Sequence, residues 1–182
     1  MEARAVNIHA DLIERALRND REAQFELYKK YSGAMYNTAL RITNDTGLAE
    51  DVLQESFLSA FQSLVFYRGE ASFGSWLKRI VVNKAISLTR RESKMEFTDD
   101  ESSLDGVEVI KEEGEYTVEM VREAIEELPN GFRTVLSLYL LEGYDHQEIS
   151  EILDISESTS KTQFKRAKEK LRMIISERYG QD

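Results

Sequence analysis

The spacing of apolar residues constrains the fold of this chain most. Apolar side chains recur every three to four positions through most of the sequence, and no alternating apolar and polar run is long enough to predict a strand. The 182 residues include one proline and nine glycines. Because proline and glycine are the main helix breakers, this composition favours helix throughout. The sequence therefore predicts an all-α fold.

Several chemical functions are excluded by what the sequence lacks. There is no cysteine, and the two histidines, His9 and His146, have no neighbouring ligands of the kind that a zinc or di-iron site needs. No Glu-x-x-His motif occurs, and no serine, histidine and aspartate suggest a triad. We therefore expect no metal, no cofactor, no catalytic residues and no enzymatic activity.

The hydropathy pattern argues against a membrane protein. No apolar run reaches 18 residues, and the N-terminus has no hydrophobic segment of the signal-peptide type. We expect a cytoplasmic protein that does not insert into a membrane.

The net charge of −10 is concentrated in one part of the chain. Residues 96–128 carry 2 basic and 13 acidic side chains, a net −11, whereas residues 1–95 carry +2 and residues 129–182 carry −1. Within that stretch, residues 96–115 lack helical periodicity and are rich in Ser, Gly and like charges that repel. They are predicted to be a flexible acidic linker between two small helical domains, residues 1–95 and 116–182.

The first domain opens with a helix that Asp20 caps over residues 21–31, and Gly33 is expected to interrupt a pattern that then resumes. A further helix over residues 48–65 gathers its core residues on one side. Its opposite side is either an ordinary solvated face or a partner surface, because a leucine lies among polar residues in a narrow stripe there. The stripe consists of Asp51, Gln54, Glu55, Leu58 and Gln62.

The last helix of the first domain is predicted over residues 73–94, after a loop at residues 67–70. Its inner stripe runs from Phe73 to Leu88, and its other face carries Trp76 and several polar or basic groups. With Tyr67, Arg68 and Phe73 beside it, this face suits single-stranded nucleic acid, because aromatic rings stack on unpaired bases while cations contact phosphates. Spacing alone equally allows Trp76 to cap a small core.

The second domain contains a helix-turn-helix pattern. Thr117 is predicted to cap its first helix, residues 129–131 break that helix, and Gly143 ends the next one. Asp145 can cap the first helix of the motif, and Asp154 occupies the turn position that glycine more often fills.

The second helix of the motif is cationic. From Glu157 to Arg172 it carries six basic and two acidic side chains, a net +4. Such a helix fits docking in a DNA major groove, although Thr162 and Gln163 are ambiguous readers of bases. A basic helix can also bind an acidic protein, in which case the chain would be a helical adaptor.

Taken together, these segments resemble the extracytoplasmic-function (ECF) group of the bacterial sigma-70 family, the promoter-recognition subunits of RNA polymerase. The resemblance is carried by residues 49–61, 67–85, 128–139 and 146–171, and it spans nearly the whole chain. It implies a region 2-like domain, a region 4-like domain and a role in promoter recognition, promoter melting and transcription initiation.

The resemblance also implies partners and contact residues. Asp51, Gln54, Glu55 and Leu58 of the stripe are expected to bind the β′ coiled coil of core RNA polymerase. The β flap is expected as a second contact. The resemblance leaves open whether an anti-sigma factor is a further partner. The melted minus-10 element is expected to meet Arg68, Phe73, Trp76, Arg79, Asn83 and Lys84. The double-stranded minus-35 element is expected to meet Lys161, Thr162, Lys165, Arg166 and Lys168.

One alternative remains at this point. A helix-turn-helix regulator that never replaces a polymerase subunit would show the same second domain. The stripe from Asp51 to Gln62 argues against it, because such a regulator has no need of a polymerase-binding surface.

Overall fold

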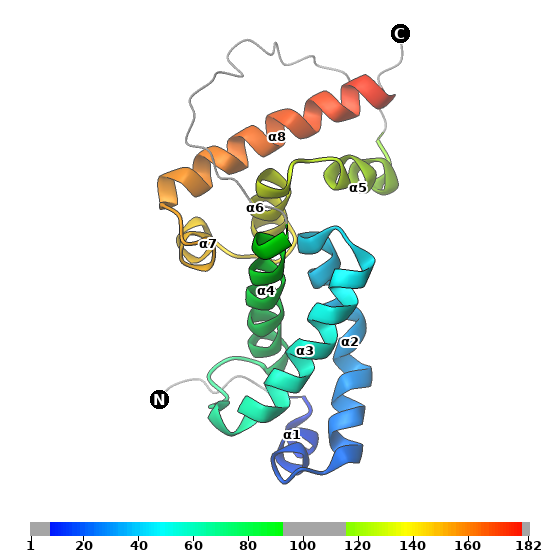
Figure 1. Ribbon diagram of the computed structural model, residues 1–182, viewed down its shortest axis with the longest axis vertical. Coiled ribbons are helices and arrows are strands. Elements are labelled where there is room, and N and C mark those ends of the chain that lie inside the picture. The colour runs from blue at the N-terminus through cyan, green and yellow to red at the C-terminus, as the bar shows by residue number, and fades with distance from the viewer. Residues whose placement is uncertain (1–7, 93–115, 180–182) are drawn as a thin grey trace. The chain divides into compact units, whose positions relative to one another are not determined.

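The computed structural model describes residues 8–92 and 116–179 (Figure 1). The described residues form two compact units, one within each range. They contain eight α-helices, one short 3-10 helix and no strand. The prediction of an all-α fold is therefore confirmed. The predicted linker at residues 96–115 lies outside the described residues.

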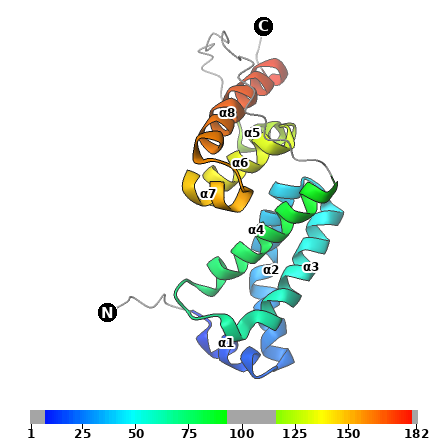
Figure 2. The same cartoon turned by 60° about the vertical axis from the view of Figure 1, so that its left-hand side comes forward.

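The first unit contains four α-helices: α1 (Ala10–Leu17), α2 (Arg21–Thr43), α3 (Thr46–Ser63) and α4 (Phe73–Glu92), with the 3-10 helix η1 (Leu64–Phe66) after α3. Helix α2 packs against the other three, and α3 also packs against α4 (Figure 2). The helices meet on buried apolar side chains, which include Leu27, Ile42, Val52, Phe57, Leu64, Leu77 and Val81.

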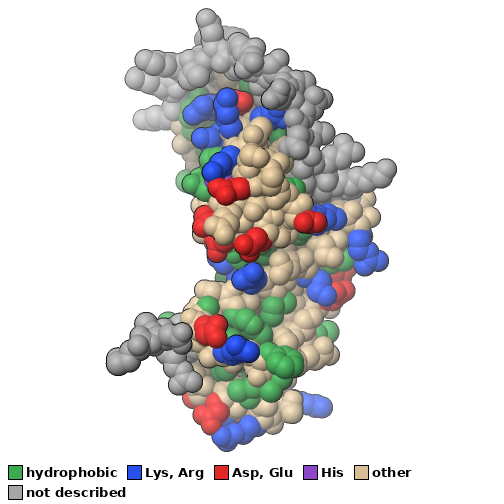
Figure 3. All heavy atoms as spheres, turned by 90° about the vertical axis from the view of Figure 1, so that its left-hand side faces the viewer, with side chains coloured by type: hydrophobic (Ala, Val, Ile, Leu, Met, Phe, Trp, Pro, Cys, Tyr) green, Lys and Arg blue, Asp and Glu red, His purple; other side chains and the backbone are tan. Residues whose placement is uncertain are grey.

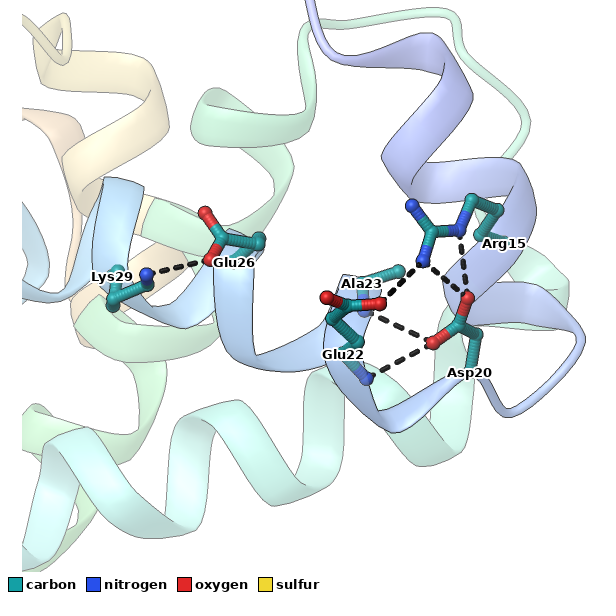
Figure 4. Close-up of polar contacts among 6 residues, drawn as sticks. All are labelled: Arg15, Asp20, Glu22, Ala23, Glu26 and Lys29. Atoms are coloured by element: carbon teal, nitrogen blue, oxygen red, sulfur yellow. Dashed lines mark hydrogen bonds and ion pairs between the residues drawn. The ribbon is translucent and has the colours of Figure 1, made fainter.

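Helix α2 begins at the predicted N-cap, Asp20 (Figure 4). One Asp20 carboxylate oxygen accepts from the backbone N–H groups of Glu22 and Ala23 at 3.0 and 3.2 Å. The other accepts from the Arg15 Nε–H at 2.7 Å, which ties α1 to the start of α2. The hydrogen bond from Arg15 lowers the pKa of Asp20 below its ordinary value, with the backbone donors adding to the effect.

Gly33 does not interrupt α2, so that expectation was wrong. The helix continues through Gly33 to Thr43, and a β-carbon at Gly33 would meet nothing within 4 Å. A glycine inside a helix costs only about 1 kcal/mol relative to alanine. Met35, Ala39 and Ile42 are buried beyond it, and burying such side chains outweighs that cost, since each large one contributes about 1.5–3 kcal/mol.

The second unit also contains four helices: α5 (Val118–Glu126), α6 (Asn130–Leu140), α7 (His146–Leu153) and α8 (Glu157–Tyr179). The long helix α8 packs against the other three, as its position in Figure 1 shows. One buried cluster joins α5, α6 and α8 through Ala124, Leu128, Leu136, Ala167 and Ile174.

The predicted caps and turn of the second unit are observed. Thr117 accepts a hydrogen bond from the Met120 N–H at 3.3 Å and begins α5. Asp145 accepts from the Glu148 N–H at 2.8 Å, while the Glu148 side chain accepts from the Asp145 N–H at 2.9 Å. Asp154 follows α7 with φ 47° and ψ 52°, the left-handed conformation that aspartate tolerates better than most residues. These local features fix both ends of α7.

Arg133 holds the turn between α5 and α6. Its side chain is buried, and the guanidinium donates to the Leu128 carbonyl at 2.7 Å and to the Asn130 side chain. Burial lowers the pKa of Arg133. The guanidinium also donates to the carbonyl of Glu126, the last residue of α5, at 3.4 Å, a group that the end of the helix leaves without a helical partner. The sequence carried no sign of this role, because a lone arginine on a helix is usually exposed.

Candidate functional site

The stripe on α3 faces solvent. Asp51, Gln54, Glu55 and Leu58 are all exposed, and Leu58 has an exposed fraction of 63%. Since successive helical residues are 100° apart, this face is opposite the one whose side chains pack into the core. The stripe thus combines two carboxylates with an accessible apolar side chain, a surface that suits a cationic partner with an apolar contact of its own.

The loop between η1 and α4 is held by its own polar groups. The Tyr67 hydroxyl donates to the Ala71 carbonyl at 2.7 Å. The Ser72 hydroxyl accepts from the Ser75 N–H at 3.2 Å, which caps the start of α4. At Gly74 a β-carbon would lie 3.0 Å from the Tyr31 ring, so glycine lets α4 begin close against α2. These contacts hold the conformation of the loop that carries Arg68.

An aromatic cluster lies beneath this loop, and it corrects one prediction. Phe73 has an exposed fraction of only 1%, and its ring centroid lies 5.2 to 5.9 Å from those of Tyr31, Tyr67 and Trp76. A ring enclosed in this way cannot stack on a base, so Phe73 is not part of a surface for nucleic acid. It supports Trp76, which is half-buried and also contacts Tyr67 at 5.1 Å.

The remaining predicted residues of this surface reach solvent. Arg68, Arg79 and Asn83 are exposed. Lys84 is half-buried, and its Nζ lies 3.0 Å from a Glu55 carboxylate oxygen on α3. On the face that Figure 3 shows, hydrophobic side chains of the first unit gather in one patch, with basic and acidic side chains beside it. Neighbouring rings and cations are what single-stranded nucleic acid requires.

The second helix of the helix-turn-helix motif, α8, presents a row of lysines. Ser156 caps it by accepting from the Thr159 N–H at 3.0 Å. Lys161, Lys165 and Lys168 are exposed at the i, i+4 and i+7 positions, which lie on one face. Thr162 is exposed beside the row and Arg166 is half-buried.

The same face of α8 extends further than predicted. Arg172 is exposed four residues after Lys168 and continues the row. Its spacing of i+4 from Lys168 was the available signal, but Arg172 is not among the residues that the resemblance predicts to meet the minus-35 element.

The lysines of α8 have only weak local partners. Lys161 lies 2.6 Å from Glu157 and Lys165 lies 3.9 Å from Glu169, one helical turn away in each case. The Lys168 ammonium stands 4.8 Å from the centre of the Phe164 ring. Exposed pairs of this kind contribute about 0 to 1 kcal/mol. A phosphate can therefore replace these carboxylates at little cost.

Gln163 does not face solvent, which corrects its interpretation as a reader of bases. Its exposed fraction is 1%. It lies two residues after Lys161, and a step of two residues turns a side chain about 200° around a helix. Ser160 is also buried, and its hydroxyl lies 2.9 Å from His146 Nδ1 on α7. Both side chains therefore serve the packing of the motif.

His146 links the helices of the motif. Its ring stacks on Tyr139 of α6 at 4.6 Å and meets Phe164 of α8 edge-on at 5.6 Å. Burial lowers the pKa of His146 below its ordinary value of 6.5, and the charge of Lys161 lowers it further, against smaller opposite effects of Glu157 and Asp145. The neutral imidazole is therefore the form that fits the folded unit.

This environment predicts a pH dependence. The folded unit binds the His146 proton more weakly than the unfolded chain does, so His146 stabilises the fold above pH 6.5 and this contribution is lost as the pH falls through the lowered pKa. Hydrogen exchange of the α7 and α8 amides, corrected for intrinsic rates, should show less protection at about pH 5.5 than at about pH 7.5. His146→Gln should reduce this difference in protection. If the difference is unchanged in that variant, His146 is not its cause.

Comparison with known proteins identifies the family. The model of sigma-70 region 2 matches residues 27–95, and the model of sigma-70 region 4 matches residues 118–171. The RNA polymerase sigma-H factor of Pseudomonas aeruginosa is 30% identical over 174 residues, covering 87% of this chain and 89% of that protein. The ECF sigma factor SigM of Bacillus subtilis is 29% identical over 155 residues, covering 83% and 94%. The chain belongs to the sigma-70 family, in its ECF group.

Two solved structures share the fold. CnrH, in complex with the cytosolic domain of CnrY, matches with a TM-score of 0.55 and 20% identity, covering 92% of this chain and 96% of that one. The sigma factor RpoE of Bartonella quintana, in complex with the anti-sigma factor NepR, matches with a TM-score of 0.57 and 18% identity, covering 83% and 95%. Both support the helical fold of the described residues.

As a sigma factor, this protein binds core RNA polymerase and promoter DNA and directs promoter recognition, promoter melting and transcription initiation. Sigma factors are in general regulatory subunits without enzymatic activity. Within residues 8–92 and 116–179, no helix has the length and apolarity to cross a membrane. The same residues hold no cluster of three or more acidic or histidine side chains placed for a metal ion.

Proposed function

We propose that residues 1–95 bind core polymerase and the melted minus-10 element, that residues 116–182 bind the minus-35 element, and that residues 96–115 link the two. The protein itself makes and breaks no bonds, because initiation chemistry belongs to the polymerase. It works in the cytoplasm, where that enzyme acts, and meets the β flap as well as the β′ coiled coil. RpoE of Bartonella quintana, which shares this fold, is in complex with the anti-sigma factor NepR, and this suggests an anti-sigma factor as a further partner here.

The observation that carries this proposal is the opposite chemistry of two packed helices. The exposed face of α3 is acidic and apolar, and α4 with its preceding loop exposes cations around a tryptophan. Carboxylates repel DNA phosphates, so the acidic face of α3 suits a protein partner. The cations and the tryptophan of α4 and its preceding loop suit a nucleic acid. The polymerase contacts are Asp51, Gln54, Glu55 and Leu58. The minus-10 contacts are Arg68, Trp76, Arg79, Asn83 and Lys84.

On α8 the exposed lysine row enters the major groove of the minus-35 element. Lys161, near the N-terminus of the helix, can donate to guanine, while Lys165 and Lys168 contact phosphates. Thr162 and Arg166 lie beside the row and complete the surface. The two units thus bind one promoter at two places, and the melted strand is held because unpaired bases bind better than paired ones.

Trp76→Ala tests the minus-10 assignment. Loss of one stacked base contact costs about 1–3 kcal/mol, so the holoenzyme should open a promoter about 5- to 150-fold less well. Permanganate reactivity of unpaired thymines measures the opening. Trp76→Phe keeps a stacking ring and should retain most of it. If Trp76→Ala folds normally and opens the promoter as well as the parent protein, Trp76 is a packing residue only.

A further inference from the structure

The ion pair between Lys84 and Glu55 joins the two proposed surfaces of the first unit. Lys84 Nζ lies 3.0 Å from Glu55 Oε2, and the two side chains have exposed fractions of 31% and 53%. Glu55 comes from α3 and belongs to the stripe proposed to bind polymerase. Lys84 comes from α4 and belongs to the surface proposed to bind the melted strand. In the free protein, Lys84 therefore neutralises the Glu55 carboxylate that polymerase would bind. Glu55 in turn neutralises the Lys84 ammonium that a DNA phosphate would bind.

We propose that this pair is exchanged when the protein enters the holoenzyme, so that binding of polymerase at Glu55 releases Lys84 for DNA. This inference rests on the proposed function of the two surfaces. A cationic group of the polymerase takes the Glu55 carboxylate, and the Lys84 ammonium turns to a phosphate on its flexible four-carbon stem. In the free protein the ammonium stays neutralised, which weakens binding of DNA without polymerase.

The coupling must act in both directions. If polymerase at Glu55 favours DNA at Lys84, DNA at Lys84 favours polymerase at Glu55 by the same factor. The pair is close and half-buried on the lysine side, yet solvent reaches both groups, so its strength is that of an exposed ion pair. Each single neutralisation therefore changes affinity by about two- to five-fold, most clearly at low salt.

The exchange makes a prediction that a simple contact role does not. Lys84→Gln frees the Glu55 carboxylate, so it should raise the affinity of the free chain for core polymerase by about two- to five-fold. Glu55→Gln frees the Lys84 ammonium, so it should raise the affinity of the free chain for single-stranded DNA by a similar factor. In the double variant, the gain in DNA binding should disappear, because no ammonium is left to release.

Two binding measurements on the full chain test the exchange. Anisotropy of a labelled oligothymidine of about 15 nucleotides reports DNA binding, since a phosphate contact is independent of sequence. Titration of labelled chain with core polymerase in the absence of DNA measures the affinity for polymerase. Glu50→Gln on α3 and Arg91→Gln on α4 remove equal charges from exposed side chains outside both surfaces, and they correct for net charge.

The outcomes separate the exchange from the function that it rests on. The exchange is supported if both affinities rise above those of the control variants and if the rise in DNA affinity is lost in the double variant. Gains equal to the controls, or a gain for Glu55→Gln that persists with Lys84→Gln, overturn it. The exchange is also overturned if Lys84→Gln unfolds at a lower temperature and binds polymerase no better than the parent chain. The ion pair would then only stabilise the fold. If the parent chain itself binds no core polymerase, the proposed function fails instead.

Discussion

Reversing two charges on α3, with Asp51→Arg and Glu55→Arg together, is expected to weaken binding to core RNA polymerase by about 100-fold or more. Both side chains are exposed on one face, so the substitutions leave the core packing intact. The carboxylates are proposed to meet cationic groups, and placing like charges in contact costs several kcal/mol at an interface. Every step that needs the holoenzyme, including transcription, should fall with it. Titration of labelled chain with core polymerase measures the loss.

A matched variant separates this effect from net charge. Asp11→Arg with Glu14→Arg makes the same change in charge at exposed positions on α1, which is not proposed to contact polymerase. It should bind core polymerase nearly as the parent protein does. If both double variants lose binding equally, or if the α3 variant binds normally while folded, the stripe is an ordinary solvated face.

Removing the lysine row of α8 is the second large perturbation. Random-sequence duplex DNA offers Lys161 no defined guanine, so with Lys161→Gln, Lys165→Gln and Lys168→Gln together the chain should lose about three phosphate contacts. The slope of log affinity against log salt should then shrink by about 3, and affinity for duplex DNA should fall by about 100-fold near 0.1 M salt. Filter binding of the full chain to random-sequence duplex DNA, repeated over a range of salt concentrations, measures both quantities.

The control for this variant removes three cations elsewhere. Arg21→Gln, Lys29→Gln and Lys30→Gln neutralise three exposed side chains of α2. This variant should keep most of the salt dependence, because its cations are not proposed to meet phosphates. A lysine-row variant that retains the parent's salt slope would show that DNA does not bind along this face of α8.

The features that sequence reasoning found are local ones. The caps at Asp20, Thr117 and Asp145 and the left-handed turn at Asp154 depend on residues two to four positions away, and the structure confirms them. The exposed faces of α3 and α8 follow from helical spacing in the same way. The family resemblance then supplied the partners, which periodicity could not provide.

The features that sequence reasoning missed depend on residues far apart in the chain. Helical spacing places Phe73 on the inner stripe of α4, but the rings that enclose it come from Tyr31 of α2 and Tyr67 of the preceding loop, which spacing within α4 does not reveal. The pair of Lys84 with Glu55 joins two helices, and ideal periodicity gives only the face on which each residue lies. Tertiary packing decided both positions.

Gly33 and Gln163 were misread for a related reason. Glycine is a helix breaker by residue type, yet the apolar residues on both sides of Gly33 are buried in one continuous helix. Glutamine can read bases by residue type, yet Gln163 lies on the inner side of α8. In each case residue type was given more weight than the position on the helix.

Transcription with purified components tests the central claim most directly. Core polymerase freed of its own sigma factors would be supplied with this chain and a library of random promoter sequences, and the 5′ ends of the transcripts would be sequenced. The account predicts defined start sites that share two upstream sequence elements and that vanish with the Asp51 and Glu55 reversal. Two results together would contradict it. The transcripts would have no defined start sites at any template tried, and the chain would fail to bind core polymerase.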